Sequence, residues 1–120
     1  MAQFSEILQP VPFQTVKLRD SATIECHIKS EMNKTVWYKL TTENRLQLVG
    51  EFDSQYNQSV FADEFNHHYS VKFDRVSSNL SISATTRGVS GTYFCGVMHL
   101  NDSVQFGSGT FLMVEGIDSL

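Results

Sequence analysis

The sequence of 120 residues predicts an all-β fold in which two sheets pack face to face. Two observations predict it. Apolar and polar residues alternate with a period of two along most of the chain, which is the pattern of strands with one buried face. Cys26 and Cys95 lie about 70 residues apart, a separation that suits a bond between two layers of a sandwich. The length is sufficient for one core.

The alternation identifies the inward side of each expected strand. The inward sets are Ala22, Ile24, Cys26 and Ile28; Leu80, Ile82 and Ala84; Tyr93, Cys95 and Val97; Thr110, Leu112 and Val114; and the shorter set Val71 and Phe73. Two more strands are expected at roughly 46–52 and 57–62, which gives about nine in all. Pro10 and Pro12 are compatible only with an edge strand, so the first strand should bend there and switch sheets.

Trp37, the only tryptophan, follows Cys26 closely. A tryptophan after the first of two such distant cysteines is typical of an immunoglobulin sandwich, here of the variable type with its extra pair of strands. In that arrangement a Cys26–Cys95 disulfide joins the sheets, and Trp37 and Tyr93 belong to the core. Two buried free thiols are the alternative. A disulfide requires an oxidising compartment, so we expect the extracellular part of a plasma-membrane protein.

Composition excludes several classes of partner. The formal net charge of -4 argues against nucleic acid and against an anionic membrane surface. The residues 1–6 lack a signal-peptide pattern, and no apolar run is long enough for a membrane helix. We therefore expect a mature piece whose membrane segment lies outside these residues. Four Asn-x-Ser/Thr sequons are glycosylation candidates, at Asn33, Asn57, Asn79 and Asn101.

The sequence gives little support for catalysis, for a metal or for a cofactor. The Gly107-Ser108-Gly109 motif is followed by strand-like residues rather than by a helix, so it predicts a β-bulge and not a phosphate-binding loop. His67 and His68 are adjacent, and adjacent strand residues point to opposite faces. We expect both histidines to be solvated, and we expect no enzyme, because no nucleophile-elbow sequence is present.

The outward side of the front sheet should be polar but is not. Because Trp37 and Cys95 point inward, their strand neighbours point outward. The outward residues are expected to be Val36, Tyr38, Leu40, Phe94 and Phe106, with Leu48 or Val49 adding to them. A contiguous apolar face usually marks a partner site, so Tyr38, Leu40, Phe94 and Phe106 are predicted to form one. Long loops folded over the face are the alternative.

Three loops should cluster at one end of the sandwich, at about residues 27–35, 53–58 and 97–105. Loops on a rigid scaffold are a common place for binding residues. The candidate ligand-contacting residues are Met32, Asn33, Tyr56, Met98, His99, Leu100 and Asn101. Met98 and Leu100 are apolar for loop residues, so they are expected either to pack against the sheet or to meet a ligand.

Three motifs resemble antigen-receptor variable domains: Trp37-Tyr38-Lys39, Gly91-Thr92-Tyr93-Phe94-Cys95, and Phe106-Gly107-Ser108-Gly109-Thr110. Together with Cys95-Gly96 and Phe111-Leu112, these motifs most resemble those of the novel immune-type receptors of bony fish, and the resemblance covers about residues 4–115. The resemblance implies a cell-surface receptor on lymphoid cells that recognises a protein on another cell in innate immunity. It implies a variable-type domain at 1–115, with an exit at 116–120, and pairing through the front sheet as a homodimer or with another variable domain.

Four positions depart from the family pattern. Val89 stands where an Asp is usual, and His68 where that Asp's Arg partner is expected; Leu40 replaces a Gln, and Arg19 occupies a position where a turn glycine is common. Leu40 would make any pairing more apolar. Two other functions stay open: a T-cell-receptor or antibody light-chain variable domain, and an adhesion or co-receptor module that binds through its front sheet.

Overall fold

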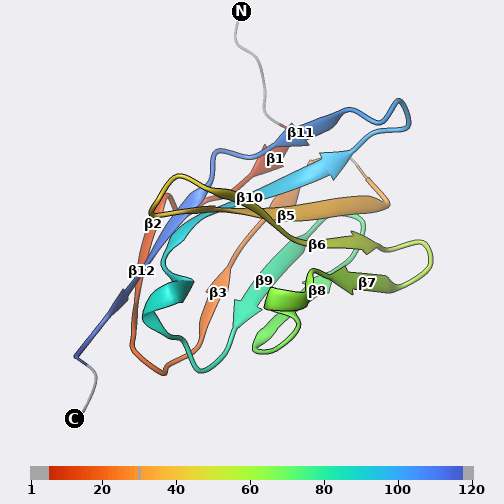
Figure 1. Cartoon of the computed structure of the whole chain (residues 1–120). Coiled ribbons are helices and arrows are strands. Elements are labelled where there is room, and N and C mark those ends of the chain that lie inside the picture. The colour runs from red at the N-terminus through yellow and green to blue at the C-terminus, as the bar shows by residue number, and fades with distance from the viewer. Residues whose placement is uncertain (1–5, 30, 118–120) are drawn as a thin grey trace, which may run out of the picture.

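The structure is a computed structural model that describes residues 6–29 and 31–117. Its strands form two facing layers (Figure 1). The larger layer, the front sheet, has the order β2-β12-β10-β5-β6-β7, and β11 also pairs with β10. Its strands are β2 (Phe13–Lys17), β5 (Lys34–Thr41), β6 (Leu46–Asp53), β7 (Gln58–Phe61), β10 (Gly91–Met98), β11 (Val104–Phe106) and β12 (Thr110–Glu115).

The opposite layer, the back sheet, has the order β3-β9-β8, and a separate two-stranded pair joins β1 to β4. These strands are β1 (Ile7–Leu8), β3 (Ala22–Ile24), β4 (His27–Ile28), β8 (Tyr69–Phe73) and β9 (Ser78–Ile82), and two short 3-10 helices are η1 (Asp63–Phe65) and η2 (Arg87–Val89). The segment pairs β1/β2, β3/β4 and β11/β12 are each one predicted strand with an interruption. The variable-type sandwich, including its two extra strands β6 and β7, is confirmed.

The first strand switches sheets at its prolines, as predicted. β1 pairs antiparallel with β4, whereas β2 runs parallel to β12 in the front sheet. Pro10 and Pro12 lie between them, where the chain crosses from one layer to the other. Proline has no backbone N–H and cannot donate a hydrogen bond within a sheet. Between two sheets no such bond is needed, so proline does not destabilise the fold there.

The predicted inward sets fill the space between the layers. Cys26 and Cys95 form the expected disulfide between the sheets, and both are fully buried with Trp37 and Tyr93. The Trp37 indole nitrogen donates a hydrogen bond to Ser78 Oγ at 3.1 Å. The prediction for Ala84 was wrong. It lies beyond β9, exposed and with φ 49°, because the chain turns there and buries Thr85 instead.

Two irregularities set which residues face outward. The last strand is interrupted between β11 and β12, as the glycine motif predicted; Gly109 has φ 90°, and a Cβ there would lie 2.7 Å from the ring of Phe94. The β5–β6 register shifts between Trp37 and Tyr38, with Trp37 opposite Gly50 and Tyr38 opposite Leu48. The extra residue, Val49, turns into the core, so Leu48 is the residue left on the outer face.

Gln9 connects three parts of the chain inside the core, and sequence reasoning missed it. Its side chain is buried, and Oε1 accepts hydrogen bonds from Cys95 N at 3.1 Å and Gly109 N at 3.0 Å. Its Nε2 donates to Tyr93 O at 2.9 Å and to Thr110 Oγ1 at 3.3 Å. The segment between β1 and β2 is thereby fixed to β10 and to the interruption before β12.

A pair of tyrosines closes the end of the core beside η2. The Tyr93 hydroxyl donates to Val89 O at 2.5 Å and lies 3.1 Å from the Tyr69 hydroxyl. Burial raises the pKa of both phenols above their usual value. Val89, which stands at the position of the usual Asp, is buried and contributes its carbonyl, and His68 is exposed in the connection before β8, not within a strand. Hydrogen bonds of the two tyrosine hydroxyls therefore stabilise this end of the core.

Lys39 remains buried beside this pair. Its ammonium donates to Gly88 O at 2.5 Å and lies 5.7 Å from the centre of the Tyr93 ring. Burial lowers the pKa of Lys39, and the negative charge of Glu43 opposes that shift. Lys39 is thus a buried cation that is held by a carbonyl and an aromatic face.

We predict that Gln9→Ala lowers the free energy of unfolding by about 3 kcal/mol or more, because two buried amides, Cys95 N and Gly109 N, each lose their acceptor. Gln14→Ala is the matched control, since Gln14 on β2 donates one bond to Thr23 O near the surface. That change should cost about 1 kcal/mol. Denaturant unfolding measures both. Equal losses in the two variants would contradict the role given to Gln9.

A second prediction concerns alkaline pH. Because the pKa of Tyr93 is raised in the folded chain, the unfolded chain alone releases this proton above pH of about 10, and stability falls as pH rises. Tyr93→Phe should cost about 1–2 kcal/mol at neutral pH through its lost hydrogen bonds. It should also reduce the loss of stability per pH unit above 10 relative to the unchanged chain. Unfolding at a series of pH values tests this, with exposed Tyr56→Phe as control; an unchanged alkaline slope in Tyr93→Phe would refute it.

Candidate functional site

The strand registers arrange the outward residues of the front sheet in three rows. The lowest row crosses β2, β12, β10, β5 and β6 and consists of Phe13, Phe111, Thr92, Leu40 and Leu46. The middle row consists of Phe94, Tyr38 and Leu48, and the upper row of Phe106, Gly96, Val36, Glu51 and Val60. We call these rows the front face. Apart from Glu51, every residue in them is uncharged.

Aromatic contacts hold the centre of the front face. Tyr38 and Phe106 meet edge to face with ring centres 5.6 Å apart, and Phe13 stacks on Phe111 at 5.7 Å. Gly96 leaves room between strands: a Cβ there would lie 2.8 Å from Val36 Cγ1 and 2.9 Å from the ring of Phe106. The rings therefore rest directly on the sheet, and their positions are fixed by neighbours rather than by solvent.

The four residues predicted for this face all lie on it, but they differ in exposure. Phe106 is 43% exposed, and Tyr38, Leu40 and Phe94 are half-buried. Val36, which was expected to be exposed, is only 2% exposed because it lies beneath the space that Phe106 and Gly96 share. A sheet face open to water on one side ordinarily carries polar residues there.

Two strongly exposed apolar residues of the front face escaped sequence reasoning. Phe13 is 55% exposed and Leu46 is 63% exposed, at opposite ends of the lowest row. Alternation within one strand could not place them, because Phe13 belongs to the strand that changes sheets and Leu46 begins β6 next to a register shift. Only the pairing across strands shows that they continue the row through Leu40.

The three predicted loops come together at one end of the sandwich, at the right in Figure 1. They are shorter than expected, at 29–33, 54–57 and 99–103, because β5, β6, β10 and β11 continue to pair further along the chain. Ser30 lies outside the described residues. The seven candidate contact residues all line one open hollow of about 920 Å³: Met32, Asn33, Tyr56, Met98, His99, Leu100 and Asn101.

The loops are stabilised by short-range contacts. Ser54 N donates to Asn33 O at 2.8 Å, which ties the second loop to the first, and Glu31 pairs with Arg75 at 3.5 Å. Met98 is half-buried at the top of β10, whereas Leu100 is fully exposed at the tip of the third loop. The two apolar loop residues therefore differ in exposure, although both line the same hollow.

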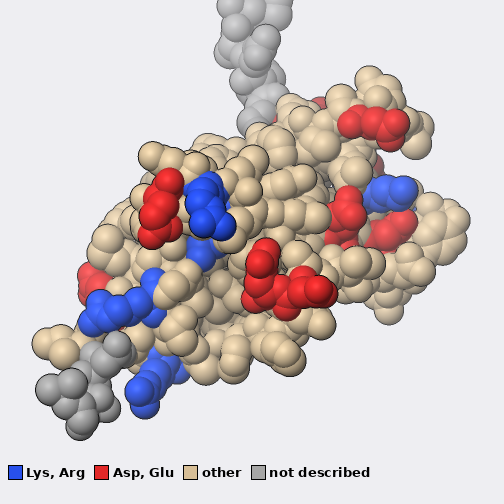
Figure 2. Space-filling view, in the orientation of Figure 1, with Lys and Arg blue, Asp and Glu red and all other residues tan. Residues whose placement is uncertain are grey.

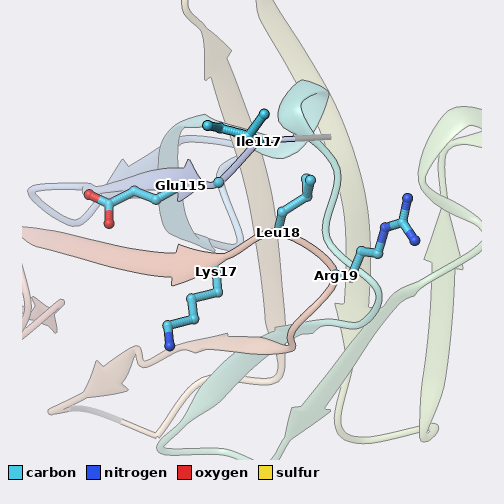
Figure 3. A pocket seen from close by; sticks show the side chains of 6 residues that line it. Lys17, Leu18, Arg19, Glu115 and Ile117 are labelled. Carbon is cyan, nitrogen blue, oxygen red and sulfur yellow. The ribbon is translucent and has the colours of Figure 1, made fainter. Parts of the chain in front are cut away.

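The opposite end of the domain carries a second hollow of about 510 Å³, lined by Lys17, Leu18, Arg19, Glu115, Gly116 and Ile117 (Figure 3). Arg19 has φ 74°, a conformation that glycine adopts more readily. Of the predicted exit at 116–120, Gly116 O accepts a hydrogen bond from Arg87, and residues 118–120 lie outside the described residues. The mixture of one anion and two cations gives this hollow no selective charge.

Charged side chains form small separate groups on the surface seen in Figure 2, with uncharged surface between them. Within the described residues, no three His, Cys, Asp or Glu side chains gather as metal ligands would. His67 and His68 are exposed, and His27 lies 3.5 Å from Glu25 at the surface. Across the same described residues, no helix is long and apolar enough to span a membrane.

The geometry offers two surfaces for contact, an apolar sheet face and a loop hollow, on a sandwich with a bond between its layers. A search among curated proteins finds no match to this chain. A family model for the immunoglobulin V-set domain matches residues 9–115, from the buried Gln9 to the end of β12. The chain therefore belongs to the immunoglobulin V-set domain family.

Proposed function

We propose that this chain is the ligand-recognition domain of a cell-surface innate immune receptor, of the kind that its sequence resembles in the novel immune-type receptors of bony fish. V-set domains are typically extracellular and commonly mediate protein–protein contacts. In this proposal two copies pair through their front faces, and the three loops contact a protein on another cell. Membrane attachment comes from a segment outside these residues.

The observation that carries the proposal is the apolar front face. Phe13, Leu46 and Phe106 expose large apolar side chains that continue through half-buried Tyr38 and Phe94. Complete burial of one such side chain contributes about 1.5–3 kcal/mol. Aromatic residues at the centre with few charges are also the composition of interface cores. A surface of this kind is stable in water mainly as part of a complex.

The distribution of charge on the front face supports a second copy of this chain as the partner that covers it. The lower and middle rows of the front face contain no charged residue, and Glu51 stands toward the β6–β7 edge. In a two-fold symmetric pair, residues near the axis face their own copies, so a charge there would repel its equivalent. The chain as a whole carries -4, which makes an uncharged centre the surface best suited to self-association.

The positions of the four sequons also support the front face as a protein interface. Asn33, Asn57 and Asn101 lie in the three loops, and Asn79 lies on β9 of the back sheet. None of the rows of the front face contains one. Glycans at any of these four positions would leave the front face free to pair, which is consistent with its use as a protein interface.

A second candidate function is adhesion, in which the front face meets the same face on an opposing cell and the loops are incidental. The extension of the lowest row to both edges of the sheet, through Phe13 and Leu46, favours it. This exposed area reaches beyond the four residues that first suggested pairing. The two functions use one surface and differ in the orientation of the two copies relative to the membrane.

We predict that the chain forms a reversible dimer and that Phe106→Arg dissociates it. The change puts a charge at the centre of the face and should weaken the dimer by about 2 kcal/mol or more, at least about thirtyfold in Kd. Sedimentation equilibrium over a wide concentration range measures it. Ser70→Arg, on the exposed side of β8, is the control and should pair normally. A monomer at every concentration would overturn the pairing.

A separate prediction distinguishes recognition from adhesion. Beads that carry the oriented chain should remain dispersed if the front faces pair side by side on one surface, and they should aggregate if the faces meet across two surfaces. Phe106→Arg should abolish aggregation, whereas Tyr56→Ala in the loop hollow should leave it unchanged. Aggregation with this pattern would favour the adhesion function. Dispersed beads together with a dimer in solution would favour recognition through the loops.

A further inference from the structure

The tip of the β10–β11 hairpin combines an exposed sequon with an exposed apolar residue. Asn101, Asp102 and Ser103 form the sequon, and Leu100 precedes it. All four line the loop hollow of about 920 Å³. The front-face pairing proposed above does not use this hollow. Leu100 is fully exposed, and Tyr56 and Met98 line the same hollow. A group of exposed apolar side chains, unlike a single one, points to something that covers it.

The geometry of Asn101 leaves its reactive atom free. Asp102 takes φ 66°, which makes the turn tight, and Asp102 N donates to His99 O at 3.0 Å. Asn101 Oδ1 accepts from Ser103 N at 3.1 Å and from Ser103 Oγ at 2.6 Å. Both of these bonds use the oxygen. The amide nitrogen, to which a glycan is attached, has no partner among the described residues.

Two of the other sequons are more constrained in the folded chain. Asn79 is half-buried and its Oδ1 accepts from Cys26 N at 3.1 Å, within the back sheet. Thr35 of the Asn33 sequon is buried, and its hydroxyl donates to Ser78 Oγ at 3.5 Å. Asn57 is exposed with φ 51°, but it is not among the residues that line the hollow. Asn101 is the sequon that is both open and placed over the hollow.

We propose that Asn101 carries an N-linked glycan that lies over the loop hollow and covers Leu100. The donor is an oligosaccharide attached to a lipid diphosphate, supplied by the secretory pathway. The Asn101 amide nitrogen forms a bond to the first sugar carbon as that carbon's bond to the diphosphate oxygen breaks. The lipid diphosphate leaves, and the amide loses one proton. The inference rests on the proposed function only in requiring secretion.

The lining of the hollow suits a sugar. Leu100 and Tyr56, which is 65% exposed, offer apolar surface to the ring face and to the acetyl methyl group of N-acetylglucosamine. Asn33 and Gln55 line the same hollow and offer amides to sugar hydroxyls. Sites for small ligands combine apolar walls and a few polar groups in the same way and span about 300–1,000 Å³. The glycan thereby makes the loop end a sugar-bearing surface.

The first experiment measures occupancy. The chain is secreted from mammalian cells and treated with peptide N-glycosidase in heavy-oxygen water, and its peptides are analysed by mass spectrometry. We expect Asn101 to be converted to labelled aspartate, and we expect Asn101→Gln and Ser103→Ala to lose that label. An unmodified Asn101 in secreted chain would overturn the inference, whether or not the other sequons are occupied.

The second experiment tests where the glycan lies. Hydroxyl-radical footprinting compares the glycosylated chain with Asn101→Gln, and labelling of Leu100 and Tyr56 should be lower in the glycosylated chain. Asn57→Gln is the control and should keep the low labelling of Leu100. Equal labelling of Leu100 with and without the Asn101 glycan would refute its placement. Dimer formation, measured separately by sedimentation, should be the same in all variants, so failure here is distinct from failure of the front-face proposal.

Discussion

The buried side chain of Gln9 is the interaction on which the geometry of this domain depends. Its single amide satisfies groups of β10 and of the segment before β12, and it comes from the connection where the first strand changes sheets. The disulfide holds the two layers together, but it does not determine how the last strand bends. A Cβ at Gly107 would lie 2.6 Å from Gln9 Oε1, so the buried amide of Gln9 leaves room only for glycine at that position. The bend that they create brings β11 across β10 and places Phe106 on the front face.

That bend explains why the front face is apolar at its centre. Phe106 reaches over Gly96, whose missing side chain provides the space, and it contacts the edge of Tyr38. Phe94 closes over Gly109 in the same way. Polar residues at these positions would have to desolvate against the sheet without partners, which is unfavourable. The geometry that closes the core thus also produces a surface that water solvates poorly.

The sequence predicted the layers well because burial within one strand has a simple period. The inward residues around Cys26 and Cys95 follow from alternation, and the two prolines mark the change of sheet. The features that the sequence did not predict depend on how neighbouring strands pair. The register shift that turns Val49 inward and the row that unites Phe13 with Leu46 have no signal in any single strand. The role of Gln9 was equally hidden, because one glutamine in a connection looks like a solvated residue until its distant partners are placed.

The front face and the loop end are physically linked through one hairpin. Phe106 lies at the base of β11, and Asn101 lies at the tip that joins β11 to β10. Packing of Phe106 against a second copy would restrain the base, and the hydrogen bonds from His99 N to Ser103 O and from Asp102 N to His99 O would carry that restraint toward the tip. Restraining a loop before it binds reduces the conformational entropy that binding must otherwise remove. Pairing through the front face, as proposed, would therefore act on the loop end without contacting it. The glycan proposed at the tip would then determine which groups the restrained loops can contact.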